Sequence, residues 1–260
     1  NLKNILITPQ GFSFIKNEVE CHFNPKHNYI FTNGMVKDKK KLRNLISDCN
    51  AVIIGSETID KEIIDHAHKL EIIIRFGSST ENIDTDYLKK NKIKLFKIRS
   101  LETIESVGKL CVSFALNYVF NIHKHSKDSS KKVWKRYMNT DPRKIKIGLI
   151  GSGGIATSFF NYGSLLGFNF SYHSRRESNL FKKKGLLFFN SLIELVKQCD
   201  IVSIHIPYKK ETINLISEKE LLHFNNKMLI NTSRAGIVSR KALTKSLNRF
   251  DNFYYFTDVL

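Results

Sequence analysis

A glycine-rich segment near the middle of the chain has the residue types and spacing of a phosphate-binding turn. The apolar run Ile145–Ile150 leads directly into Gly151-Ser-Gly153-Gly-Ile-Ala156, and a helical pattern over Thr157–Leu166 follows. In such a turn the first glycine permits the bend, the second lets the backbone approach a pyrophosphate, and a small third residue lets the helix pack on the strand. The free N–H groups at the start of the helix then face the phosphates. Glycines also mark ordinary turns, so the flanking strand and helix carry the prediction of a dinucleotide site.

The next predicted strand, Phe168–Tyr172, bears on which dinucleotide this site binds. In NAD-binding turns an acidic residue at the end of this strand holds the ribose 2′-hydroxyl. Here that position is Ser174, the next two residues are Arg175 and Arg176, and the first acidic residue is Glu177. Because a guanidinium offers a planar fork of donors to phosphate oxygens, this segment favours NADP over NAD. The alternative is that both arginines are ordinary solvated side chains of a basic protein.

Strand and helix patterns alternate along the chain, which is typical of an α/β fold with parallel sheets covered by helices. In a smaller first unit we expect elements at Asn4–Thr8, Tyr29–Thr32, Lys39–Asp48, Ala51–Ile54, Asp60–Lys69, Glu71–Arg75, Asp84–Lys90 and Lys94–Ile98. A long helix and the later elements are expected at Glu105–Lys124, Ser191–Cys199, Ile201–Ile206, Glu218–Leu222, Met228–Asn231, Arg240–Leu247 and Tyr254–Asp258. The prediction is two domains, 1–100 and 101–260, with the dinucleotide site in the second.

The composition excludes several classes of protein. With 260 residues, 42% of them hydrophobic, the chain can bury a large core and is not disordered. No apolar run approaches the ~18 residues that a membrane span needs. The four cysteines are widely spaced and form no Cys-x-x-Cys pair, as in isolated thiols of a reducing cytoplasm. We therefore expect a cytoplasmic protein with no membrane partner and no metal.

The formal net charge of +18 raises the alternative of a nucleic-acid-binding protein. The lysines are, however, spread over many segments, and only Lys131–Tyr137 interleaves aromatic and basic residues as a stacking surface for bases would. Solvated lysines and a general attraction for anionic ligands explain the charge more simply. We expect no nucleic acid partner; strongly salt-dependent retention on DNA would indicate one.

Several segments occur in an order and at spacings that resemble one known family. They are Ala51-Val-Ile-Ile-Gly-Ser, Arg75-Phe-Gly-Ser-Ser-Thr-Glu-Asn-Ile-Asp84, Gly148-Leu-Ile-Gly-Ser-Gly-Gly-Ile, Cys199-Asp-Ile-Val-Ser-Ile-His-Ile-Pro207 with Glu211-Thr212, Ile230-Asn-Thr-Ser-Arg-Ala-Gly236 and Thr257-Asp-Val259. Together they resemble the D-isomer-specific 2-hydroxyacid dehydrogenases, and most closely the phosphoglycerate dehydrogenase-like branch. The resemblance covers nearly the whole chain and is far more specific than the glycine-rich segment alone.

The resemblance implies two Rossmann-like domains with parallel sheets, a flavodoxin-like substrate domain and an NAD(P)-binding domain, with the active site between them and usually a homodimer. The family transfers a hydride between a nicotinamide ring and C2 of a small 2-oxo or 2-hydroxy acid, such as phosphoglycerate, hydroxypyruvate or glyoxylate. Arg234 matches the catalytic arginine that grips the substrate's carboxylate and carbonyl, a task that suits a two-pronged cation; the alternative is an ordinary loop arginine. Gly77, Ser78 and Ser79 match the loop whose N–H groups bind the carboxylate, where the family commonly has Gly-Val-Gly.

The same matching implies contacts with the cofactor. Gly151 and Gly153 belong to the turn itself. Gly154 and Ile155 match contacts with the pyrophosphate. Ile206, Pro207 and Thr212 match contacts on the adenosine side, and Thr232 and Ser233 match contacts on the nicotinamide side. Asp258 matches the acceptor for the carboxamide, although a buried aspartate at a strand end can instead cap a helix. Lys109 stands where the family usually has Glu, which reverses the charge.

The family's general acid and base is a histidine that follows the Arg234 motif, and a glutamate between them holds and tunes it. Both would fall beyond Leu260, so we expect the sequence to be part of a longer chain; a naturally truncated, inactive relative is the alternative. His205 lies in a His-x-Pro element that looks structural or close to the cofactor. The resemblance predicts an NAD(P)-dependent oxidoreductase, and the alternative is a non-catalytic dinucleotide-binding sensor or scaffold related to the family.

Overall fold

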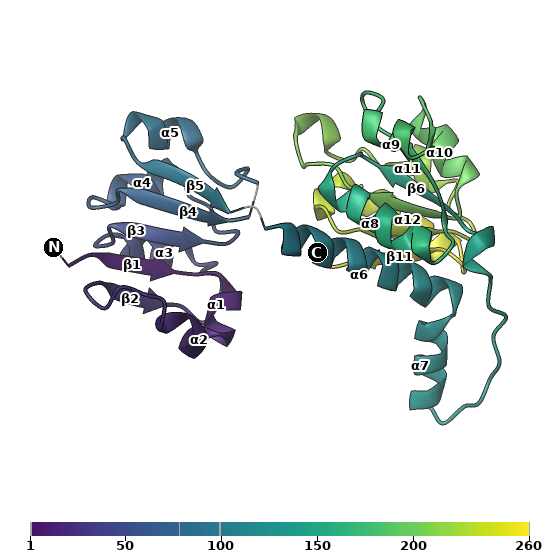
Figure 1. Ribbon diagram of the computed structural model, residues 1–260, viewed down its shortest axis with the longest axis horizontal. Helices are drawn as coiled ribbons and strands as arrows, with labels where there is room; N and C mark the ends of the chain where they lie inside the picture. Colours follow the sequence, from purple (N-terminus) through teal and green to yellow (C-terminus); the bar gives the residue numbers. More distant parts are fainter. Residues whose placement is uncertain (1, 78, 99, 260) are drawn as a thin grey trace. The chain divides into compact units, whose positions relative to one another are not determined.

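The computed structural model describes residues 2–77, 79–98 and 100–259, and the chain folds as two compact units, Asn1–Ser100 and Leu101–Leu260 (Figure 1). Each unit is built on one sheet, and all strand pairings among the described residues are parallel. Parallel neighbours need crossover connections, and helices supply most of these. The α/β class with two parallel sheets, predicted from the alternation of strand and helix patterns, is confirmed.

The first unit has a five-stranded sheet in the order β2-β1-β3-β4-β5. This is the flavodoxin-like strand order of doubly wound folds, as the resemblance implied. Its strands are β1 (Asn4–Ile7), β2 (Asn28–Phe31), β3 (Ala51–Ile54), β4 (Ile72–Phe76) and β5 (Lys94–Ile98). Its helices are α1 (Gln10–Phe14), α2 (Lys16–Glu20), α3 (Lys39–Ile46), α4 (Lys61–His66) and α5 (Thr85–Lys90). An aliphatic core fills the space between sheet and helices and includes Leu42, Ile46, Val52, Ile63 and Ile73.

Three aspartates define where the longer helices of this unit begin. The carboxylates of Asp38, Asp60 and Asp84 accept hydrogen bonds from backbone N–H groups two or three residues later, at 2.8, 3.2 and 3.0 Å. Such caps satisfy donors that have no partner within the helix. Each helix therefore starts one residue after its aspartate, whereas the sequence patterns placed Asp60 and Asp84 inside α4 and α5.

The second unit has a six-stranded sheet in the order β11-β10-β9-β6-β7-β8. Counted from β6 as the first strand, this is the 3-2-1-4-5-6 order of the Rossmann fold. Its strands are β6 (Lys146–Ile150), β7 (Asn169–His173), β8 (Leu187–Phe188), β9 (Ile201–Ile204), β10 (Met228–Asn231) and β11 (Tyr254–Thr257). Its helices are α6 (Leu101–Val119), α7 (Ile122–Ser130), α8 (Gly154–Leu165), α9 (Asn179–Lys183), α10 (Leu192–Gln198), α11 (Glu218–Leu221) and α12 (Arg240–Arg249).

Helix α6 packs along α8, and one glycine permits the close approach. A Cβ atom on Gly108 would lie within 3.0 Å of the Ser158 side chain. Next to it, the Lys109 ammonium lies 3.4 Å from the Glu105 carboxylate and 4.8 Å from the centre of the Tyr162 ring. The Tyr162 hydroxyl donates to the same carboxylate at 3.0 Å. The lysine that departs from the family pattern thus helps to join α6 to α8.

The single helix predicted over Glu105–Lys124 is wrong, because the structure has two helices there. Helix α6 ends at Val119, and Asn121 has a left-handed conformation (φ 52°) before α7 begins. Asn adopts this conformation more readily than most residues, but nothing in the apolar pattern marks it. The patterns also missed α1, α2 and α7, none of which has a buried residue and therefore none of which shows apolar periodicity.

Candidate dinucleotide site

The turn between β6 and α8 has the backbone that the glycine spacing predicts. Gly151 has φ 106°, and its N–H donates to the His173 carbonyl at 2.8 Å. A Cβ atom at Gly151 would lie within 3.0 Å of the His205 carbonyl. Glycine therefore satisfies two constraints here, a left-handed backbone and contact with the segment that follows β9.

The start of α8 offers backbone donors to an anion. Gly153 is the N-cap of this 12-residue helix, and none of the described side chains caps it. A Cβ atom on Gly153 would meet nothing within 4 Å, so the space in front of the backbone is open. N–H groups at a helix start, reinforced by the helix dipole, favour phosphate. The residues of this turn therefore fit the pyrophosphate of a dinucleotide.

A cavity of 660 Å³ adjoins the turn and is lined in part by Ser152, Gly153 and Gly154, together with Leu101 and Ile104 of α6. Its volume is in the range of small-molecule sites. Its lining mixes backbone donors with apolar side chains. The glycine turn is thus accessible from this side as well as from the sheet edge.

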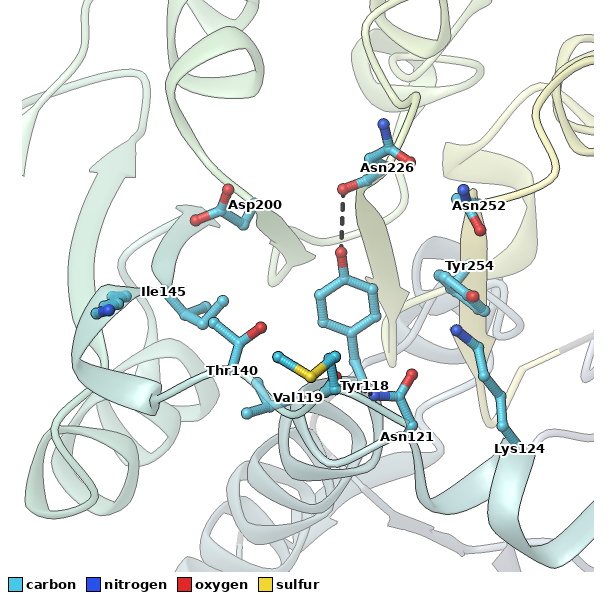
Figure 2. Close-up of a pocket in the computed structure, with 12 residues that line it drawn as sticks. Tyr118, Val119, Asn121, Lys124, Thr140, Ile145, Asp200, Asn226, Asn252 and Tyr254 are labelled. Atoms are coloured by element: carbon cyan, nitrogen blue, oxygen red, sulfur yellow. Dashed lines mark hydrogen bonds between the residues drawn. The ribbon is translucent and has the colours of Figure 1, made fainter. Parts of the chain in front are cut away.

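A second cavity, of 370 Å³, lies at the opposite edge of the same sheet (Figure 2). Ile145, Asp200 and Tyr254 line it where β6, β9 and β11 begin, and the Tyr118 hydroxyl donates to the Asn226 carbonyl at 3.0 Å across it. In open α/β sheets ligands bind at the carboxyl ends of the strands. The cavity of Figure 2 is therefore not the candidate dinucleotide site.

The candidate residues of the second unit gather at the carboxyl edge of its sheet. Gly151, Ser174, Thr232 and Asp258 each directly follow a strand, namely β6, β7, β10 and β11. These strands and β9 are parallel and lie in one sheet, so their carboxyl ends share one edge. The fold thus brings together segments that are up to about a hundred residues apart in the sequence.

The segment after β7 presents two unpaired guanidinium groups. Ser174 Oγ donates to the Arg176 carbonyl at 2.5 Å, which tightens the turn. Arg175 and Arg176 are exposed, and in the part of the chain that the structure describes neither forms an ion pair. The nearest following acid, Glu177, instead pairs with Lys182 at 3.3 Å. Because Glu177 pairs with Lys182, it does not neutralise the two arginines, and their positive charge can attract an anion.

The segment after β9 is held in shape by Thr212. Its hydroxyl donates to the Pro207 carbonyl at 2.8 Å and accepts a hydrogen bond from the Lys209 N–H at 2.8 Å. These bonds close the loop that begins with Ile206 and Pro207. Thr212 therefore shapes this segment from within the loop.

Arg234 lies in the exposed loop after β10, and the buried Asn231 fixes that loop. The Asn231 side-chain amide donates to the Arg234 carbonyl at 3.0 Å, and its oxygen accepts the Ser233 N–H at 3.0 Å. The Ser233 hydroxyl donates to the Ile204 carbonyl at 2.8 Å, which ties the loop to β9. Sequence reasoning named Thr232, Ser233 and Arg234 but missed Asn231. The available signal was an amide at the end of an apolar strand, since a buried amide needs partners.

Replacing Asn231 by Ala is expected to lower the free energy of unfolding by about 1–3 kcal/mol, because it leaves buried polar partners without hydrogen bonds. Urea denaturation measures the change. The matched control is Asn252→Ala, an exposed asparagine of the same unit, which is expected to change stability by less than about 0.5 kcal/mol. Equal changes for both variants contradict the positioning role of Asn231.

The two remaining candidates of this edge differ in exposure. Thr232 is buried, and its hydroxyl lies 3.5 Å from Cys111 Sγ. Asp258 is exposed and caps none of the described helices, and both interpretations of its role stay predictions. The strand ends at Thr257, whose hydroxyl bonds to the Asn231 and Val259 carbonyls at 2.7 and 2.8 Å. This turn leaves the Asp258 carboxylate at the surface.

The candidate substrate loop follows β4 in the first unit. Gly77 has φ 137°, and a Cβ atom there would lie 2.9 Å from the Arg75 guanidinium, so glycine is needed. Ser79 Oγ accepts the Glu81 N–H at 3.4 Å. Ser78 lies outside the described residues. The loop thus belongs to the carboxyl edge of the first sheet, whereas Arg234 and the cofactor candidates belong to the second.

His205 does not have the environment of a general acid or base. Both ring nitrogens are buried and have no hydrogen-bond partner in the described chain, and the Phe159 ring centre lies 6.1 Å away. Burial lowers the pKa of His205 to about 3, so the ring is neutral near pH 7. The neutral, enclosed ring agrees with a structural role.

Two sequence models of one family match the chain. The catalytic domain of the D-isomer specific 2-hydroxyacid dehydrogenases matches residues 5–111, and the NAD binding domain of the same family matches residues 112–260. The chain therefore belongs to the D-isomer specific 2-hydroxyacid dehydrogenase family. Its second unit contains the family's NAD binding domain, so the cofactor class is a nicotinamide dinucleotide.

Relatives within this family carry several names. D-3-phosphoglycerate dehydrogenase of Methanocaldococcus jannaschii is 25% identical over 214 residues, which cover 80% of this chain and 41% of that protein. Glyoxylate reductase of Korarchaeum cryptofilum is 26% identical over 216 residues, which cover 80% of this chain and 65% of that protein. The chain thus spans between 41% and 65% of the length of these two relatives.

Solved structures share the fold. A putative D-isomer specific 2-hydroxyacid dehydrogenase from Polaromonas superposes with a TM-score of 0.87 at 15% identity, covering 100% of this chain and 83% of that chain. D-Lactate dehydrogenase from Aquifex aeolicus, solved with NAD and lactic acid, gives a TM-score of 0.80 at 23% identity, covering 98% of this chain and 77% of that chain. At these identities the likeness establishes the fold.

Proposed function

We propose that this chain belongs to an oxidoreductase that transfers a hydride between a nicotinamide cofactor and C2 of a small 2-oxo or 2-hydroxy acid. The observation that carries the proposal is the uncapped glycine turn at the start of α8, which lies on the same sheet edge as the Arg234 loop. Membership of the family, and relatives named glyoxylate reductase, support the same reaction class.

In this proposal the second unit holds the cofactor, which supplies or accepts the hydride. Gly151 shapes the turn, and backbone N–H groups of Gly153, Gly154 and Ile155 bind the pyrophosphate, because the helix start presents unpaired donors there. The segment that begins with Ile206 flanks the adenosine, and Thr212 keeps that segment closed.

The nicotinamide end is assigned to the loops after β10 and β11. Thr232 and Ser233 line the ring, and the exposed Asp258 carboxylate accepts a hydrogen bond from the carboxamide. Ser233 is already fixed to β9 through its hydroxyl. A rigid loop would hold the ring in one orientation toward the acid.

The family resemblance supplies the candidate residues for the acid. The N–H groups of Gly77, Ser78 and Ser79 bind its carboxylate, and the Arg234 guanidinium holds the carboxylate and the carbonyl oxygen together. A two-pronged cation also stabilises negative charge that develops on that oxygen during reduction. His205 is not assigned the proton transfer, because its ring is enclosed and neutral.

Calorimetric titration of glyoxylate into protein saturated with oxidised NADP tests this function without turnover. We expect glyoxylate to bind in the presence of the dinucleotide and to bind much more weakly without it. Binding of the dinucleotide with no binding of any 2-oxo acid would favour the non-catalytic sensor or scaffold. Failure of both ligands to bind would contradict the proposal.

We further propose that NADP is preferred over NAD. Two observations support this preference: the guanidinium groups of Arg175 and Arg176 after β7 are exposed, and Glu177 forms its ion pair with Lys182. A carboxylate at the strand end would repel a 2′-phosphate, and Ser174 stands there instead.

The double variant Arg175→Ala/Arg176→Ala is expected to weaken NADPH binding by about ten- to a hundredfold, because the loss of one charge-assisted hydrogen bond costs about 1.5–3 kcal/mol. NADH binding should change less than about threefold. Fluorescence titration of the reduced nicotinamide measures both dissociation constants. Lys183→Ala/Lys184→Ala removes the same charge from exposed residues nearby and should affect the two cofactors equally. Equal effects of the arginine variant on NADPH and NADH would contradict the 2′-phosphate site.

We also propose a cytoplasmic homodimer. Among the described helices, none has both the length and the apolar character needed to cross a membrane. The cysteines Cys21, Cys49, Cys111 and Cys199 are free thiols, which suits a reducing compartment. The homodimer is proposed from the family resemblance.

A further inference from the structure

The loops at the carboxyl edge of the first sheet form one connected surface, which we call the rim. The rim consists of the described residues 8–14, 32–37, 55–58, 76–77 and 79–80. These loops follow β1, β2, β3 and β4, and the proposed carboxylate-binding loop is one of them. In a doubly wound sheet this edge is where ligands bind.

Contacts between the loops hold the rim together. The buried Glu57 carboxylate accepts the N–H groups of Gly55 at 2.7 Å and Val36 at 3.3 Å, which joins the loops after β3 and β2. Ser56 Oγ donates to Met35 Sδ at 2.7 Å between the same two loops.

An aromatic pair continues the rim to the loop after β4. The Phe12 ring of α1 packs edge-on against Phe76, with the ring centres 5.4 Å apart. Phe76 directly precedes Gly77, the first residue of the proposed carboxylate-binding loop. The side chains of Phe12 and Phe76 therefore lie beside that loop, while Met35 belongs to the loop after β2 at the same sheet edge.

The rim exposes apolar side chains. Phe14, Met35 and Phe76 have 77%, 40% and 43% of their surface exposed. Single exposed apolar residues are common on proteins, but several together beside a predicted substrate loop indicate a binding surface.

The rim is also poor in positive charge within a very basic chain. Lys and Arg make up 42 of the 260 residues, yet the four rim segments contain a single one, Lys37. Arg75 precedes the last segment, but its side chain is buried and donates to the Phe76 carbonyl. Phosphate and sulfonate groups are bound by clustered arginines and lysines, and the rim presents no such cluster in its sequence.

Given the proposed function, on which this inference rests, we infer that the acid carries an uncharged apolar group beyond its carbonyl carbon, such as a branched aliphatic or aromatic group. Phe76 and Met35 contact that group while the neighbouring loop binds the carboxylate. Burial of the group against these side chains supplies binding that glyoxylate, which lacks such a group, does not gain. A terminal phosphate would meet exposed apolar surface instead.

The test compares three acids by calorimetry with protein saturated with oxidised NADP: ketoisocaproate, glyoxylate and phosphohydroxypyruvate. We expect ketoisocaproate to bind at least about tenfold more tightly than glyoxylate. Phosphohydroxypyruvate should bind no more tightly than glyoxylate. Tighter binding of glyoxylate or phosphohydroxypyruvate overturns the inference and leaves the proposed function intact. If none of the three acids binds, the proposed function itself is contradicted.

Two rim variants test whether the preference among the three acids arises at the rim. Phe76→Arg is expected to weaken ketoisocaproate binding at least about tenfold and to strengthen phosphohydroxypyruvate binding, because it replaces apolar surface by a phosphate donor. Phe96→Arg is the matched control, since Phe96 is 54% exposed on β5 outside the rim. If circular dichroism shows that Phe76→Arg is unfolded, Met35→Arg carries the same expectation. An unchanged order of the three acids in a folded rim variant overturns the inference.

Discussion

Substituting alanine for Gly151 is expected to abolish nicotinamide dinucleotide binding and to lower the free energy of unfolding by about 2–5 kcal/mol. The new methyl group would collide with the His205 carbonyl, and alanine would have to adopt φ near 106°. The turn can accept this residue only by moving away from β9, which displaces the start of α8 from the phosphates. Thermal or urea unfolding and a fluorescence titration with NADPH measure the two effects.

Two other glycines separate the causes of this loss. Gly185 also has a positive φ (77°) but has no atom within 4 Å of a Cβ position, so Gly185→Ala should show only the backbone strain of about 1 kcal/mol. A Cβ atom at Gly153 would have no protein atom within 4 Å, so Gly153→Ala should leave folding intact. The same substitution should weaken binding of the cofactor. A Gly151→Ala protein with normal stability and normal NADPH affinity would refute the turn geometry.

In a protein that carries the family's general acid and base, the change Arg234→Lys is expected to reduce kcat/KM for the 2-oxo acid at least about a hundredfold. An ammonium is a point charge and cannot hold a carboxylate and a carbonyl oxygen with two parallel donors. NADPH binding should stay within about twofold of the original value, because the proposed role of Arg234 is toward the acid. Steady-state kinetics and a parallel cofactor titration separate the two quantities.

A conservative change elsewhere provides the reference for Arg234. Arg240→Lys alters an exposed arginine at the start of α12 and should leave both turnover and cofactor affinity unchanged. If Arg234→Lys behaves like Arg240→Lys, Arg234 does not hold the substrate. The loop itself should keep its position in Arg234→Lys, since Asn231 binds the Arg234 backbone rather than its side chain.

The sequence predicted the strands best where apolar runs are bounded by polar residues. The predicted bounds of Ala51–Ile54, Lys94–Ile98 and Met228–Asn231 are those of β3, β5 and β10. Strands β3 and β10 are buried or half-buried and read as apolar runs, so their limits are visible without the structure, whereas the exposed β5 contains two lysines. The glycine turn was likewise predictable, because its steric requirements allow few other residues.

Other features depend on contacts between distant residues and left no local signal. The break between α6 and α7 rests on the backbone of Asn121, and the positioning of the Arg234 loop rests on the buried amide of Asn231. Lys109 reverses the charge that the family usually has at this position. In the structure its ammonium pairs with Glu105 one turn earlier in α6 and lies over the Tyr162 ring of α8. Strand β11 ends at Thr257, one residue earlier than the apolar pattern predicts, and the Thr257 hydroxyl bonds to the Val259 carbonyl.

Amide hydrogen exchange with and without NADPH locates the dinucleotide on the chain. We expect slower exchange at residues 151–156, 174–176 and 232–234, at the carboxyl edge of the second sheet. We expect no change around Tyr118, Asn226 and Tyr254, which line the cavity at the opposite edge (Figure 2). Protection confined to that opposite cavity, or unchanged exchange at residues 151–156 with saturating NADPH, would show that the glycine turn does not bind the dinucleotide.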